Sequence, residues 1–125
     1  MNAMKPQGVI ETAVCEGMRH FAQDFMGRGP SQIEVHLIGV VLLIRLQGVL
    51  TPAEQRLVQT LPPEQGRDLL KQARMQLIES SRPMMEAMVQ EATGVKVVSL
   101  HHDISTVTGE EFVIFTLDNS PCRLR

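Results

Sequence analysis

The densest group of potential metal ligands in the sequence consists of His101, His102 and Asp103. On a β-strand, neighbouring side chains point to opposite faces, so His101 and Asp103 can share a face that His102 cannot join. A zinc site needs three or four ligands, and His36, on another predicted strand, is the residue that would have to supply a further one. We expect surface and half-buried histidines here, and no metal site.

Pairs of acidic residues suggest general acid–base chemistry, but their spacing does not favour it. Glu110 and Glu111 are adjacent on a predicted strand and therefore point apart. Glu86 and Glu91 are five residues apart on a predicted helix, which does not bring them face to face. We expect all four carboxylates to be solvated surface groups.

A thiol nucleophile with a histidine base is suggested by Cys15 and His20. They are five residues apart, whereas contact on a helix needs a spacing of three or four. Cys15 and Cys122 are the two cysteines and have no zinc-type spacing, so we expect two free thiols in a reducing compartment. The sequence also lacks a P-loop, a dinucleotide-binding fingerprint, a nucleophile elbow and an H-E-x-x-H motif. These observations predict that the chain is not an enzyme and holds no cofactor.

Arg28 is the one residue whose loop suggests anion binding. It lies between two glycines in Gly27–Pro30, directly after a predicted helix end. Such a loop can present backbone N–H groups and a guanidinium to an anion or carboxylate. A helix stop with an exposed Arg explains the same residues, and this alternative stays open.

Composition excludes further classes of function. The 125 residues include eight Met and four Phe but no Trp or Tyr, with a net charge of −2. Scarce aromatic rings disfavour stacking sites for single-stranded nucleic acid, and the lack of a basic excess disfavours nucleic acid in general. The longest apolar run, from Val35 to Leu46, is much shorter than the ~20 residues of a spanning helix. We expect a soluble, cytoplasmic protein with no direct membrane span, folded as a single domain over residues 1–125 with flexible tails at 1–7 and 119–125.

Gly and Pro residues divide the chain into segments of helical or strand periodicity. Helices are predicted over about 6–26, 51–60 and 64–93, and strands over about 33–37, 41–47, 95–102 and 110–117. The second helix begins with a capping box, in which Thr51 and Glu54 satisfy each other's backbone N–H groups. Pro83 interrupts the long helix, which is therefore either one bent helix or two abutting ones.

The order helix, two strands, helix, long helix, two strands indicates an α+β fold. Its simplest form is a four-stranded antiparallel sheet made of two hairpins, with the helices packed on one face. Gly39 and Val40 connect the first hairpin, and because Val resists positive φ we expect a looser turn or a bulge there. The strand regions 35–46 and 95–117 carry apolar side chains on both faces. The second face is therefore expected to meet another molecule, most simply a second copy in a homodimer.

Methionine side chains are concentrated along the long helix, and two of the four Phe lie on the last strand. Flexible thioethers can adapt to a partner surface, although filling the core is their commoner use. The candidates for an interface are Met75, Met84, Met85, Met88, Phe112 and Phe115.

Three stretches in this order and spacing resemble the MpsC-like family, long described as a domain of unknown function. They are residues 27–35, 48–54 and 93–98, the last continuing through His101–Thr106 to Thr108–Glu110. The resemblance covers about residues 8–118. It rests on the ordered combination of the stretches, since each alone is unspecific.

The resemblance implies a role beside a membrane system. The family is named for a component of a bacterial system linked to sodium translocation, membrane potential and inorganic carbon supply, whose companions are membrane proteins. It therefore implies a non-catalytic accessory or regulatory protein with transporter subunits as partners, and it carries over no catalytic residues. A small-ligand or anion-sensing domain is the alternative. The candidates for its ligand site are Arg28, Gly29, Pro30, His101, Asp103, Ser105 and Thr106.

Overall fold

The computed structural model describes residues 5–25, 27, 29–60 and 62–122. Its helices are α1 (Gln7–Phe25), α2 (Pro52–Thr60), α3 (Pro63–Ser80) and α4 (Arg82–Thr93). Its strands are β1 (Gln32–Ile38), β2 (Val41–Gln47), β3 (Val97–Ile104) and β4 (Glu111–Leu117). Arg28 lies outside the described residues, and so do parts of the two predicted tails. The predicted α+β class and order of elements are confirmed.

The four strands form one antiparallel sheet in the order β1-β2-β4-β3. The two sequential hairpins are joined through their second strands, because β2 pairs with β4. The edges of the sheet are therefore β1 and β3. A bulge between Val97 and Ser99 shifts the register of β3 against β4.

The first hairpin closes through a tight two-residue connection. Ile38 pairs with Val41, which leaves Gly39 and Val40 as the turn. The expected looser turn or bulge is wrong, because the pairing runs without a shift to the turn, where Gly39 takes a positive φ of 61° and Val40 does not. A turn with positive φ at its first central residue only matches the right-handed twist of the flanking strands.

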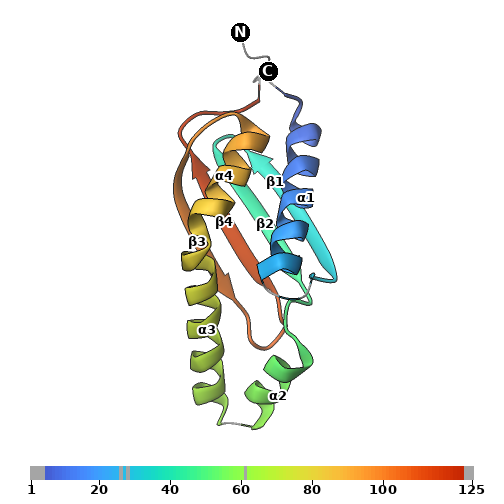
Figure 1. Cartoon of the computed structure of the whole chain (residues 1–125), viewed down its shortest axis with the longest axis vertical. Helices are drawn as coiled ribbons and strands as arrows, with labels where there is room; N and C mark the ends of the chain where they lie inside the picture. The colour runs from blue at the N-terminus through green and yellow to red at the C-terminus, as the bar shows by residue number, and fades with distance from the viewer. Residues whose placement is uncertain (1–4, 26, 28, 61, 123–125) are drawn as a thin grey trace.

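Helices cover one face of this sheet (Figure 1). α1 packs against β1 and α4, while α3 and α4 pack against β3. α2 packs on α3 at the lower end of Figure 1, beyond the end of the strands, and none of its residues is buried. The helices therefore form one layer over the inner sheet face, with the α2–α3 pair extending past it.

The core lies between the sheet and this helical layer. Alternate residues of the two central strands face it, and Leu42, Ile44, Val113 and Phe115 are almost completely buried. The helices contribute further aliphatic and thioether side chains, with Met18 and Met85 each 1 % exposed. An aliphatic, Met-containing core is what the scarcity of aromatic residues implies.

The long helical segment is two helices, not one bent helix. Ser81 leaves helical geometry at φ −100° and ψ 6°, and its hydroxyl donates a hydrogen bond to the carbonyl of Leu77 at 2.6 Å. Pro83 is the second residue of α4, where a backbone N–H has no partner in the helix. The missing N–H of Pro83 therefore costs nothing at this position, and the break itself falls at Ser81.

Candidate functional site

The outer face of the sheet is left uncovered by the helices of the described part of the chain. The strand register aligns Val41 and Leu43 of β2 with Thr116 and Ile114 of β4 on this face. Phe112 continues the apolar strip opposite Arg45. The side chains of Val41, Leu43, Phe112 and Ile114 are only half-buried, although they lie on the two central strands. The centre of the outer face is thus an apolar strip open to solvent.

Polar and charged side chains flank this strip on the two edge strands. In register with Leu43 and Ile114 lie His36 on β1 and His101 on β3. Within the described residues, no group of three or more His, Cys, Asp or Glu side chains is arranged to hold a metal ion. His101 and Asp103 do share a face, as predicted.

Arg45 organises the charges at one end of the outer face. Its Nε donates a hydrogen bond to Glu110 at 2.6 Å, and its Nη1 donates one to Glu34 at 2.9 Å. The hydrogen bond to Glu110, with the charges of Glu110 and Glu34, raises the pKa of Arg45. Glu34 also lies 3.5 Å from the ring of His36. The charged groups here are consequently paired within the chain.

A second surface feature is a hollow of about 450 Å³ between α3 and β3. Lys71 of α3 reaches Asp103 at 2.9 Å across it. The hydrogen bond from Lys71, followed by that from the backbone N–H of Ile104, lowers the pKa of Asp103. On the same side, His102 lies 3.3 Å from Glu79. These contacts tie the edge strand to the helical layer.

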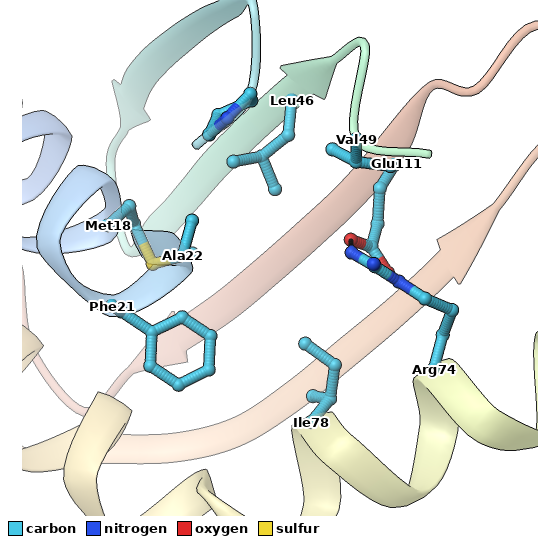
Figure 2. Close-up of a pocket in the computed structure, with 9 residues that line it drawn as sticks. Met18, Phe21, Ala22, Leu46, Val49, Arg74, Ile78 and Glu111 are labelled. Atoms are coloured by element: carbon cyan, nitrogen blue, oxygen red, sulfur yellow. Dashed lines mark hydrogen bonds and ion pairs between the residues drawn. The ribbon is translucent and has the colours of Figure 1, made fainter. Parts of the chain in front are cut away.

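The floor of this hollow is a buried ion pair. Arg74 of α3 donates a 2.6 Å hydrogen bond to Glu111 of β4, and the two residues are 5 % and 2 % exposed. Figure 2 shows both side chains directed at each other beside an interior cavity of about 20 Å³, the room of one water molecule. Glu54 of α2 lies 3.9 Å from the same guanidinium.

Glu111 corrects the expectation that all four acidic residues are solvated. It points inward because it shares a strand face with Val113, Phe115 and Leu117. Arg74 likewise lies in helical phase with the buried Leu70 and Ile78. The alternation of buried and exposed residues along β4, continued back to residue 111, indicates that Glu111 points inward. No comparable pattern in the sequence indicates that Arg74 is its partner.

The predicted ligand-site residues do not converge on one place. Pro30 lines the interior cavity with Arg74 and Glu111, and Gly29 precedes it in the loop after α1. His101 lies on the outer face, whereas Asp103 is bound to Lys71. Ser105 closes the β3–β4 loop with a 2.8 Å backbone hydrogen bond to Glu110. Thr106 lines a separate hollow with residues of α2, such as Gln55 and Val58.

The predicted interface residues divide into three groups. Met75 and Met84 are 43 % and 51 % exposed on the outer side of the helical layer. Met88 is half-buried against the core, and Phe112 lies in the apolar strip of the outer sheet face. Met85 and Phe115 are core residues, 1 % and 0 % exposed, so the prediction of an interface role is corrected for these two.

Taken together, these features define an α+β protein with one open sheet face, on which Arg45 is paired with Glu34 and Glu110. The chain matches the family described as "Na+-translocating membrane potential-generating system (MpsC)" over residues 6–119. It belongs to the MpsC family. None of the helices in the described part of the chain has both the length and the apolar character needed to cross a membrane.

One curated relative is similar to this chain over most of the length of both proteins. It is "Uncharacterized protein YbcI" of Bacillus subtilis (strain 168), which is 31% identical over 115 residues. The match covers 92% of this chain and 90% of the relative. No solved structure matches the chain significantly.

Proposed function

We propose that this chain is a non-catalytic accessory component of the membrane system after which its family is named. In this proposal it acts in the cytoplasm by protein–protein contact, as a homo-oligomer beside transporter subunits. The observation that carries the proposal is the open apolar strip of Val41, Leu43, Phe112 and Ile114. Contiguous apolar surface rimmed by polar residues is typical of protein interaction sites.

The pairing of the charged groups supports a non-catalytic role. General acid–base or nucleophilic catalysis needs polar groups that converge on a place where a substrate can lie. Here Arg74 is directed at Glu111, Lys71 at Asp103, and Arg45 at two carboxylates. These groups hold helices and strands together, which is a structural use of charge.

The ligand-sensing alternative has less support. A sensing site requires several polar groups around one pocket, and the described candidates are divided among the interior cavity, the outer face and two hollows. We therefore place the interaction role first.

Recovery of partners from native membranes tests the proposal. The chain carrying an affinity tag is expressed in its own host, and the detergent-solubilised membranes are passed over the affinity resin. We expect co-purification of the sodium-translocating subunits with the unaltered chain. Leu43→Glu places a charge in the apolar strip and is expected to abolish the recovery.

Val107→Glu is the matched control. Val107 lies in the β3–β4 loop and is 93 % exposed, so the added charge touches no packed surface. This variant should recover the same subunits as the unaltered chain. If the unaltered chain recovers no transporter subunit, the proposed function is wrong.

A further inference from the structure

We infer that the outer face of the sheet binds a second copy of this chain, face to face, to form a two-fold symmetric dimer. This inference rests on the proposed function and names the surface that joins the copies of the homo-oligomer, so that transporter subunits bind the assembled dimer and not the buried strip. The contact centres on Leu43 and Ile114, which are neighbours across β2 and β4. It uses the face, rather than the edges, of the sheet.

The edges of the sheet are unsuited to pairing with another chain. At β1, the outward backbone N–H of Leu37 donates a 2.8 Å hydrogen bond to the carboxylate of Glu11 on α1. At β3, the backbone N–H of Val97 is bound by the side chain of Gln90, and a bulge interrupts the strand beside it. Bulges and occupied donors block strand addition. These features disfavour edge-to-edge pairing at the positions named, and we place the contact on the face.

The size of the face fits a dimer contact. Strands of seven residues in a four-stranded sheet give a flat outline of roughly 440 Å², from about 3.3 Å per residue and about 4.8 Å between strands. Side chains standing on the sheet raise its accessible surface above the flat outline. The flat outline alone is about half of the ~800 Å² that each partner buries in a standard interface.

The charge pattern fits an identical partner. A buried charge without a partner is costly, so a strongly charged face would need a partner of opposite sign. Arg45 is already held by Glu34 and Glu110 at one end of the face. The other end carries Ile38, which is 64 % exposed, with Val41 and Thr116 in the same row. Asp103, at the β3 edge, is likewise held by Lys71, so the charges that a second copy brings are already paired within each copy.

The packing geometry of such a dimer follows from the way β-sheets stack face to face. Two stacked sheets lie about 10 Å apart, with strand directions within about 30° of each other. A two-fold axis between the two sheets places the apolar strip of one chain against the identical strip of the other. This is the self-complementary arrangement of a closed dimer. Leu43 and Ile114 become the buried centre, while His36 and His101 become part of the rim.

Light scattering coupled to size-exclusion chromatography tests the dimer. At tens of micromolar, we expect the unaltered chain to have twice the mass of one chain. Leu43→Glu should have the mass of a single chain, with an unchanged circular dichroism spectrum. Val107→Glu should remain a dimer.

A milder substitution keeps the test valid if Leu43→Glu fails to fold. Leu43→Thr introduces a β-branched side chain suited to a strand, yet it removes apolar contact from both copies. Its dimer dissociation constant, measured by sedimentation, should rise at least about tenfold. An unaltered chain that is monomeric at these concentrations overturns the inference, and so does a dimer that neither substitution weakens.

The two proposals fail separately. A monomeric chain that recovers transporter subunits in a Leu43-dependent manner removes the dimer but leaves the accessory role standing, with the transporter on the sheet face. A dimer that recovers no transporter subunit removes the accessory role but leaves the dimer standing.

Discussion

Arg74 and Glu111 join three elements at a point where the helical layer meets the sheet. Arg74 belongs to α3 and Glu111 to β4, and the same guanidinium lies near Glu54 of α2. A buried ion pair adds little net stability against apolar residues of the same volume, but breaking it leaves a charge without compensation. The pair therefore makes the docking of α3 specific more than it makes it strong.

We predict that Arg74→Ala lowers the free energy of unfolding by about 3–5 kcal/mol, because Glu111 would remain buried and unpaired. The double substitution Arg74→Met with Glu111→Leu should restore most of this loss. Urea denaturation measures both variants. Arg82→Ala removes half-exposed ion pairs to Glu79 and Glu86 and should cost less than about 1 kcal/mol. Equal costs for Arg74→Ala and Arg82→Ala would contradict the assignment.

The Lys71–Asp103 contact predicts a small pH dependence. Because the folded-state pKa of Asp103 is lowered by Lys71, its contribution to stability is present above the unfolded pKa of about 3.9 and is lost as the pH falls through the lower folded value. Asp103→Asn keeps an acceptor for the N–H of Ile104 and removes only the charge. The side chain is 76% exposed, so the difference should stay below about 1 kcal/mol and shrink with salt.

Urea midpoints of the unaltered chain and of Asp103→Asn, followed from pH 7 to pH 3, measure this effect. The two curves should approach each other in acid. A gap that stays constant over the whole range would show that the charge of Asp103 is not involved.

At the scale of elements, the stability of α2 depends on the capping box at its N-terminus. Thr51 and Glu54 form the predicted capping box, with hydrogen bonds of 2.8 Å from the N–H of Thr51 and 3.1 Å from the N–H of Glu54. α2 has no buried residue to hold it otherwise. Its cap and its contact with α3 are therefore its main supports.

We predict that Thr51→Ala costs about 0.5–2 kcal/mol, because the N–H of Glu54 loses its acceptor. Thr51→Ser keeps the hydroxyl and should cost much less. Thermal unfolding of both variants measures the difference. If Ser and Ala at this position behave alike, the methyl group of Thr51, rather than its hydroxyl, supports α2.

Local signals predicted the elements well, and contacts between distant segments much less so. The capping box at Thr51 and the hydrophobic periodicities of helices and strands depend on residues close together in the sequence. The α+β order could therefore be predicted from them. The adjacency of β2 and β4 has no local signal, because it joins Val41 to Thr116. Met84 and Met85 illustrate the same limit, since the helix break at Ser81 decides which of two neighbours faces the core.

The candidate site was predicted in outline only. Apolar residues on both faces of the strands indicated an open sheet face, and the structure has one. The expected ligand residues are scattered, because residues 29–30 lie in the loop after α1, whereas residues 101–106 lie on β3 and in the loop after it. Glu111 escaped prediction because a charged residue is assigned to the surface unless its partner is known, and Arg74 is remote in sequence.

On the scale of the whole molecule, stability is distributed unevenly. β2 and β4 lie in the centre of the sheet with alternate residues fully buried, whereas α2 extends beyond the sheet with none. Regions with few buried contacts open locally at low free-energy cost. The α2–α3 end of the molecule is thus its least protected part.

Hydrogen exchange followed by mass spectrometry tests this distribution. We predict that amides of α2 exchange at least about tenfold faster than those of β4, with α4 in between. Equal protection of α2 and β4 would show that α2 unfolds only with the whole chain. Comparison of dilute and concentrated samples adds a check on the dimer, since association protects what it covers.

The order of the strands also has a consequence for synthesis. β4 lies between β2 and β3, yet it is made after both of them. Until residues 111–117 are in place, β2 and β3 lack the strand that lies between them in the sheet. Each of the two neighbouring strands then presents an unsatisfied backbone edge and half of an apolar core. The nascent chain is consequently most vulnerable to misassembly just before β4 pairs with β2 and β3. Substitutions that weaken β4 should therefore reduce the yield of folded protein more than their cost in equilibrium stability implies.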